Sequence, residues 1–136
     1  MAFKLYSTDD GHVPAWEYHT IASGAKVAVG TGMAFDENGK LVASKLPTHI
    51  CMVETADPKT GIAADMIGPV VRIAPDQIWE SALYTDASAG VTPGKKVDIA
   101  DNPVYVDGAK SVNSNFEITY AAGSLMGDVV RGRFVK

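Results

Sequence analysis

The sequence predicts an all-β fold, a small β-barrel or β-sandwich of short antiparallel strands with an N-terminal extended arm and little helix. Many short apolar runs are separated by turn residues, as in barrels and sandwiches. Two segments that open at Gly24 and Gly94, seventy residues apart, share one pattern of apolar runs around an Asx-Gly pair. No run has the length of a convincing helix.

The Asx-Gly pairs are Asn38-Gly39 and Asp107-Gly108. Such pairs readily take the positive φ of tight turns, so both are predicted to be hairpin tips of one β domain. The repeated pattern indicates either an internal duplication or the ordinary reuse of Val, Lys and Gly in antiparallel sheets. Both interpretations remain open from the sequence.

The strands follow from β-branched and aromatic runs between turn signals. Loops are expected at 56–61 and 86–94, where Pro and Gly occupy turn positions. The run 77–83 is ambiguous, because Pro75-Asp76 suits a helix start whereas Ile78 and Trp79 favour a strand. We predict a strand there, and at most one short helix near 76–81 or 58–64. The predicted strands are 16–19, 26–29, 33–35, 41–44, 49–54, 65–74, 77–83, 96–99, 104–106, 116–120 and 128–135.

Residues 1–23 differ from the rest and are predicted to form an extended arm or flap, with 24–136 as a single β domain. Aromatic and apolar side chains gather in the segment, interrupted by polar turn residues. It would cover an open barrel end, lie on another subunit, or pack as a strand on its own domain. The predicted interface residues of this segment are Phe3, Leu5, Tyr6, Val13, Trp16 and Tyr18.

Composition excludes several classes of protein. The 136 residues carry 12 basic and 16 acidic side chains, a net charge of −4, and no basic run longer than Lys95-Lys96. A nucleic-acid partner is therefore not expected, because such binders gather positive charge. No apolar run approaches the roughly 20 residues of a membrane helix or resembles a signal peptide. The single cysteine, Cys51, excludes an internal disulfide.

The search for reactive groups predicts no enzyme, no cofactor and no metal. Cys51 and His49 would share a strand face, but a buried cysteine is the more common case. The histidines His12, His19 and His49 have no metal-ligand spacing. Neither a phosphate-binding glycine loop, nor a calcium loop, nor a Gly-x-Ser-x-Gly elbow occurs.

A family resemblance begins with residues 3–18, FKLYSTDDGHVPAWEY. It continues through Gly24-x-Lys26-Val27, Gly32-Met33-Ala34, Gly39-Lys40-Leu41-Val42, Ile50-Cys51-Met52, Val70-Val71-Arg72-Ile73 and Gly127-Asp128-Val129-Val130. In these segments the chain resembles capsid decoration proteins of tailed bacteriophages, also called cement or head-stabilising proteins. The resemblance implies a compact β-rich domain on the outer face of the capsid that clamps neighbouring major capsid protein subunits. A homo-oligomer is expected, with a trimer favoured over a monomer or dimer.

From this resemblance we expect a structural virion protein, made in the host cytoplasm and bound to the capsid outer surface. The six interface residues of the N-terminal segment are then expected to form a capsid or subunit interface. Deletion of residues 2–14 is expected to abolish attachment and leave the domain folded. A second hypothesis is a carbohydrate-binding or adhesive β-module that stacks sugars on Trp79, Tyr84 or Trp16. A third is a small Cys/His hydrolase, which requires a reactive thiol at Cys51.

Overall fold

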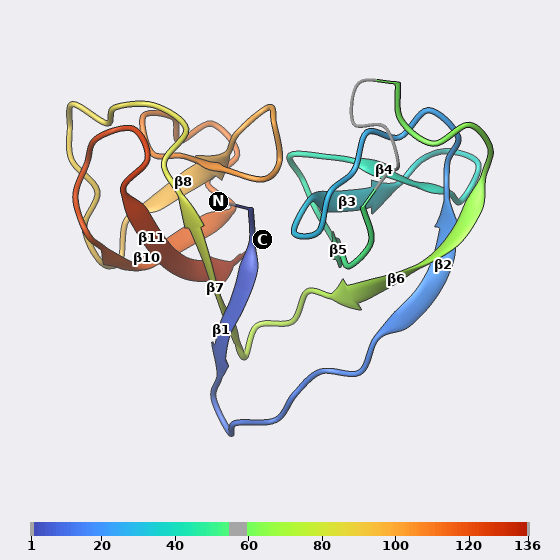
Figure 1. The fold of residues 1–136 in the computed structure, drawn as a ribbon. Coiled ribbons are helices and arrows are strands. Elements are labelled where there is room, and N and C mark those ends of the chain that lie inside the picture. Colours follow the sequence, from blue (N-terminus) through green and yellow to red (C-terminus); the bar gives the residue numbers. More distant parts are fainter. Residues whose placement is uncertain (1, 55–59, 136) are drawn as a thin grey trace.

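The computed structural model describes residues 2–54 and 60–135, and these residues form strands and no helix. The all-β prediction is confirmed, and Figure 1 shows a barrel beside an open sheet. None of the described residues forms a helix suited to crossing a membrane. The strands are β1 (Lys4–Thr8), β2 (Glu17–Ile21), β3 (Gly32–Phe35), β4 (Leu41–Ala43), β5 (His49–Cys51), β6 (Met66–Arg72), β7 (Gln77–Ala82), β8 (Lys96–Ile99), β9 (Val106–Asp107), β10 (Phe116–Ala121) and β11 (Val129–Phe134).

The barrel is closed, with five strands in the order β2-β4-β3-β5-β6. All of its pairings are antiparallel except β2 with β4, which pair in parallel at Ile21 and Leu41. Alternate residues of each strand point inward. Gly68 faces Ile21 from β6, and a Cβ at Gly68 would lie 2.7 Å from the Ile21 Cδ1 atom. The buried interior side chains are Ile21, Val27, Met33, Leu41, Cys51 and Val70.

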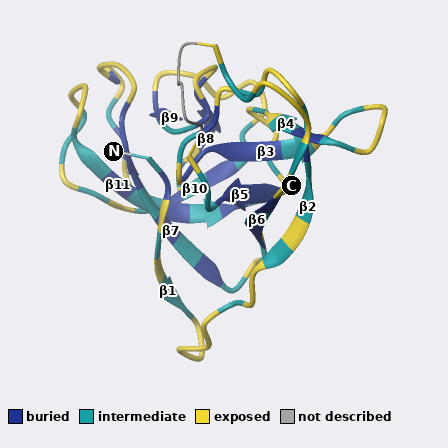
Figure 2. Cartoon of the chain, turned by 45° about the vertical axis from the view of Figure 1, so that its right-hand side comes forward, coloured by how far each residue is buried: buried dark blue, intermediate teal, exposed yellow. Residues whose placement is uncertain are grey.

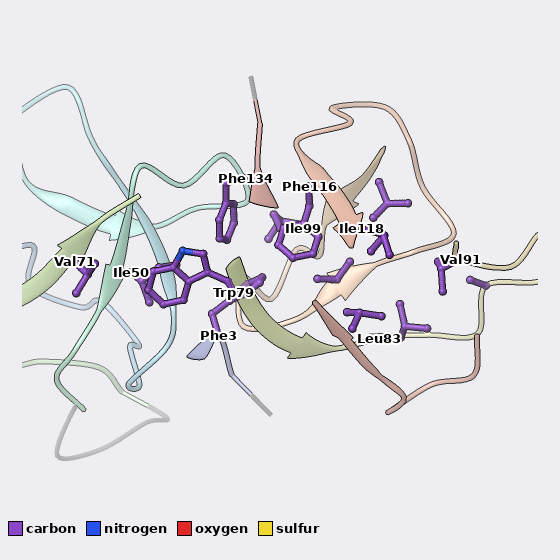
Figure 3. Close-up of a cluster of buried hydrophobic side chains, with 14 residues drawn as sticks. Phe3, Ile50, Val71, Trp79, Leu83, Val91, Ile99, Phe116, Ile118 and Phe134 are labelled. Carbon is purple, nitrogen blue, oxygen red and sulfur yellow. The ribbon is translucent and has the colours of Figure 1, made fainter. Parts of the chain in front are cut away.

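The six-stranded sheet has the order β1-β7-β11-β10-β8-β9 and is antiparallel throughout. Its core is aromatic: the Phe134 ring contacts Phe3, Trp79 and Phe116, and Phe3 also contacts Phe116 (Figure 3). The same buried cluster includes Ile50 of β5 and Val71 of β6. The outer face of the barrel therefore shares one hydrophobic core with the sheet.

The chain crosses between the two halves twice, once from β1 to β2 and once from β6 to β7 (Figure 1). The Asp9 amide donates to the Asp76 carbonyl at 3.0 Å, which joins the two crossings. Residues 1–23, separated in the sequence analysis as an arm or flap, thus contribute β1 to the sheet and β2 to the barrel.

One of the two predicted hairpin tips is confirmed. Asn38-Gly39 connects β3 to β4, whose last pair is Phe35 with Leu41. Gly39 has a φ of 74°, and Asp36 closes the loop through its backbone and its carboxylate. The turn needs positive φ at Gly39 alone, because Asn38 is not among the residues with positive φ.

The prediction for Asp107-Gly108 is wrong. Residue 107 ends β9, which pairs with β8, and the chain after Gly108 does not return as a paired strand. Gly108 lies against Val91 and Leu83 and lacks the positive φ that a tight hairpin requires. The glycine is needed here for close packing.

The predicted strand at 26–29 is also wrong. The segment runs between Gly24 and Gly30, which both have positive φ. The Ala28 amide donates to the Thr31 hydroxyl, which in turn donates to the Ala28 carbonyl, so neither backbone group of Ala28 pairs with another strand. The strand at 77–83 is confirmed as β7, so no helix forms at 76–81. The alternative helix position at 58–64 lies partly outside the described residues, and 60–64 contains none.

Candidate functional site

The structure does not bring the six predicted interface residues together. Phe3 is buried in the aromatic core, which removes it from the set of exposed anchors. Leu5 is partly buried against the same core. The exposed members are Tyr6 on the sheet, Val13 in the crossing, and Trp16 and Tyr18 at β2.

Tyr6 has partners within its own chain. The Arg131 guanidinium carbon lies 3.9 Å from the centre of the Tyr6 ring and 4.5 Å from that of Tyr120. Arg131 Nε donates to the Glu80 carboxylate at 2.7 Å. Cation–π stacking and the ion pair thus hold the Tyr6 side chain against its own sheet.

Tyr18 belongs to an exposed apolar surface on the outside of the barrel, and the exposed Trp16 lies directly before β2. Tyr18 is opposite Pro69 in the β2–β6 register, and Thr20 is opposite Ile67. The exposed fractions are 55% for Trp16, 64% for Tyr18 and 72% for Ile67. We call Trp16, Tyr18, Ile67 and Pro69 the β2–β6 face; its exposed strip in β2 is yellow in Figure 2.

At one end of the barrel the inward-facing positions change from apolar to polar. Along β2, Ile21 is in the barrel core, and His19 and Glu17 follow on the same face toward the end. By the same alternation His49 follows Cys51 in β5, and Arg72 follows Val70 in β6. We call this group, together with Phe35 of β3, the barrel mouth.

The barrel mouth is centred on the Glu17 carboxylate. Its Oε1 atom lies 2.9 Å from His19 Nε2 and 3.6 Å from His49 Nε2. Arg72 Nε donates to Oε2 at 2.9 Å, and Arg72 Nη2 donates to Oε1 at 3.2 Å. The Phe35 ring meets both imidazoles edge-on, with centroids 5.2 Å from His19 and 5.3 Å from His49.

His49 is the buried member of the group, with an exposed fraction of 4%. Its Nδ1 atom lies 2.8 Å from the Thr48 hydroxyl, which also donates to the Met33 carbonyl at 3.5 Å. Its Nε2 atom is buried and has no hydrogen-bond partner among the described residues. A buried polar atom without a partner is unfavourable by about 1–3 kcal/mol, so its retention calls for an explanation.

The surroundings at the barrel mouth shift the pKa values of Glu17 and His49. Hydrogen bonds from His19 and Arg72 lower the pKa of Glu17 to about 2. Burial lowers the pKa of His49, against the opposing effect of the Glu17 carboxylate. At neutral pH the pair is therefore an ionised carboxylate beside a neutral imidazole.

Two hollows flank the barrel mouth. One of about 800 Å³ is lined by Phe35, His49 and Arg72 of the mouth and by Phe134 of β11. The other, of about 310 Å³, is lined by Glu17 and Arg72 and by residues of the crossing segments. The polar group thus lies between two hollows at the end of the barrel.

The structure buries Trp79 and Cys51, one residue from each of the two alternative hypotheses, whereas Tyr84 and Trp16 of the carbohydrate hypothesis are about half exposed. Trp79 is buried, and its Nε1 atom donates to Gln77 at 3.0 Å, so its ring has no free face for a sugar. Cys51 is buried in the barrel, where burial raises the pKa of its thiol, and Sγ donates to the Val53 carbonyl. A raised pKa disfavours the thiolate that nucleophilic attack requires.

None of the sequence-based predictions includes the barrel mouth. A signal was present in Glu17-x-His19, since residues at i and i+2 of a strand share a face. His49 is thirty residues from His19, and only barrel closure brings it near. Comparison of the chain with protein-family models, with curated proteins and with solved structures gave no match.

Proposed function

We propose that this protein decorates the outer surface of a tailed-phage capsid and stabilises it by clamping neighbouring major capsid protein subunits. It would be made in the host cytoplasm and bind as a homo-oligomer, with a trimer favoured. The resemblance of residues 3–18 and of the later motifs to decoration proteins supports this proposal. So does the scaffold, in which two β-structured halves share one core.

The β2–β6 face is the observation that carries the proposal. Trp16, Tyr18 and Ile67 are all more than half exposed. The register of β2 with β6 places Tyr18 and Ile67 on one face of the barrel, and Trp16 lies directly before β2. Exposed apolar patches mark interaction sites, and tryptophan and tyrosine are the most common anchors of protein interfaces. This face, rather than the whole segment 1–23, is the surface we assign to the capsid.

Point substitutions test this assignment better than the deletion of residues 2–14. That deletion would remove Phe3 from the core and β1 from the sheet, so loss of binding would follow from unfolding. The double variant Trp16→Ala/Tyr18→Ala changes exposed side chains only. The matched control is Tyr84→Ala, an exposed aromatic residue on the sheet half.

The first step is a search for a major capsid protein gene beside the gene for this chain, and the measurement is co-sedimentation with expanded empty heads assembled from that protein. We expect wild type and Tyr84→Ala to sediment with the heads, and the double variant to bind at least about tenfold more weakly. Failure of the wild-type protein to bind would refute decoration. Equal binding by the double variant would refute the β2–β6 face as the contact.

A further inference from the structure

We propose that Glu17, His19 and His49 form a binding site for a divalent first-row transition-metal ion, represented by Zn²⁺, at the barrel mouth. The side chains offer one carboxylate oxygen and two imidazole nitrogens, all within 4.8 Å of one another. Nitrogen and carboxylate oxygen are the donors that these ions prefer. The site is separate from the β2–β6 face and does not depend on capsid decoration.

The separations of the ligand atoms suit a small ion. Tetrahedral bonds of about 2.0–2.2 Å place ligand atoms about 3.3–3.6 Å apart. Glu17 Oε1 lies 2.9 Å from His19 Nε2 and 3.6 Å from His49 Nε2. The ligand atoms of His19 and His49 lie within 4.8 Å of each other, so the side chains would close around the ion. His19 would bind it through Nε2 in the tautomer that carries its proton on Nδ1, and the ion would replace the present hydrogen bond to Glu17 Oε1.

The orphaned atom of His49 points to a ligand independently of the cluster. Its Nε2 atom is buried, lacks a hydrogen-bond partner among the described residues, and faces Glu17 Oε1 beyond hydrogen-bond distance. When the Thr48 hydroxyl donates to the Met33 carbonyl, its oxygen accepts the proton of His49 Nδ1. Nε2 then carries the lone pair that a metal requires.

The surrounding side chains hold the ligands in place. Arg72 Nε binds Glu17 Oε2, so the carboxylate stays oriented when the ion takes Oε1 and displaces the weaker Arg72 Nη2 contact. Phe35 packs edge-on against both imidazoles. Such contacts with the outer atoms of ligands are a regular feature of metal sites.

The geometry leaves a coordination position for water. Three protein ligands do not complete a tetrahedron, and the His19 and Glu17 side chains are each about one-third exposed to solvent. An ion would link β2 to β5, which are not paired with each other in the barrel. Since binding to the folded state alone stabilises it, the ion would act as a clasp at this end of the barrel.

The test uses the tag-free full chain, stripped with EDTA and titrated with ZnCl2 by calorimetry, with the melting temperature measured in parallel. We expect one Zn²⁺ per chain and a melting temperature that rises with Zn²⁺ concentration. Glu17→Gln and His19→Ala should each bind more than about tenfold more weakly. The matched control is His12→Ala, which removes the one histidine outside the cluster and should bind as wild type.

Two further measurements make the outcome decisive. Co²⁺ should give visible absorption bands that Zn²⁺ abolishes, whereas Mg²⁺, which prefers oxygen ligands, should not compete. His49→Leu should fold and lose Zn²⁺ binding; if it unfolds, Glu17→Gln and His19→Ala decide the question. No Zn²⁺ binding by the wild type, unchanged binding by both of these variants, or loss of binding in His12→Ala would overturn the proposal.

Discussion

The barrel and the sheet are both built from short strands, yet they fill their interiors differently. The sheet packs four aromatic rings from Phe3, Trp79, Phe116 and Phe134 into its core. The barrel interior holds smaller aliphatic and sulfur-containing side chains, and its inward positions become polar at one end. A closed barrel has ends that its own small core does not cover, and there a carboxylate and two imidazoles meet. The cluster of Glu17, His19 and His49 therefore lies in the half with the smaller core.

The largest expected change in the free energy of unfolding comes from substitutions in the hydrophobic core, and it tests whether the barrel and the sheet depend on one shared core. Trp79→Ala should lower the free energy of unfolding by about 3–5 kcal/mol, because Trp79 is fully buried in the cluster shared with Ile50 and Val71. Leu41→Ala, inside the barrel, should cost about 2–5 kcal/mol.

Urea unfolding of Trp79→Ala measures this dependence. The chain has two tryptophans, so Trp16 at the start of the barrel is then the only one left. Its fluorescence and the circular dichroism of the whole protein should report one common transition. Two separate transitions would mean that the halves are stable independently.

A smaller effect distinguishes the two Asx-Gly pairs. Gly108→Ala should cost about 1–3 kcal/mol, because its Cβ would approach Val91 and Leu83 to 2.8 and 2.9 Å. Gly39→Ala has open space and should cost only about 1 kcal/mol, from the positive φ of 74°. Denaturant midpoints measure both.

Asparagine substitution provides the control, since asparagine tolerates positive φ. Gly39→Asn should be milder than Gly39→Ala, whereas Gly108→Asn should be at least as harmful as Gly108→Ala. The reverse order at either position would contradict the distinct roles that the structure gives to the two glycines.

The smallest expected change in stability comes from the Lys40–Asp65 ion pair on the barrel surface. Hydrogen bonds from Lys40 and from the Ser23 amide lower the pKa of Asp65. A carboxylate with a lowered pKa stabilises the fold above its ordinary value of about 4, and this contribution is lost as the pH falls through the folded value. Asp65→Asn should therefore show a smaller loss of melting temperature between pH 7 and about pH 3 than the wild type.

Glu37→Gln removes one exposed acidic side chain in the same half and is the control for a simple change of net charge. It should keep the pH dependence of the wild type. An equal response of the two variants would show that the Lys40–Asp65 ion pair adds nothing to the barrel.

The sequence by itself determined the all-β class and most strand positions, because alternating apolar runs and turn residues are local signals. It located the turn at Asn38-Gly39, where the conformation depends on one glycine and on Asp36 beside it. The hairpin predicted at Asp107-Gly108 does not form. The glycine at this position is explained by its close packing against Val91 and Leu83, which the neighbouring residues in the sequence do not reveal.

Only the tertiary structure decided which residues meet. Phe3 and Tyr18 look alike in the sequence as aromatic members of one N-terminal segment. Yet Phe3, directly before β1, is buried in the sheet core, whereas Tyr18 of β2 is exposed on the barrel. Glu17 and His19 are neighbours by strand alternation, but His49 joins them only because β2 and β5 both pair with β6. Pairing between distant strands is set by the closure of the barrel, and no local pattern encodes it.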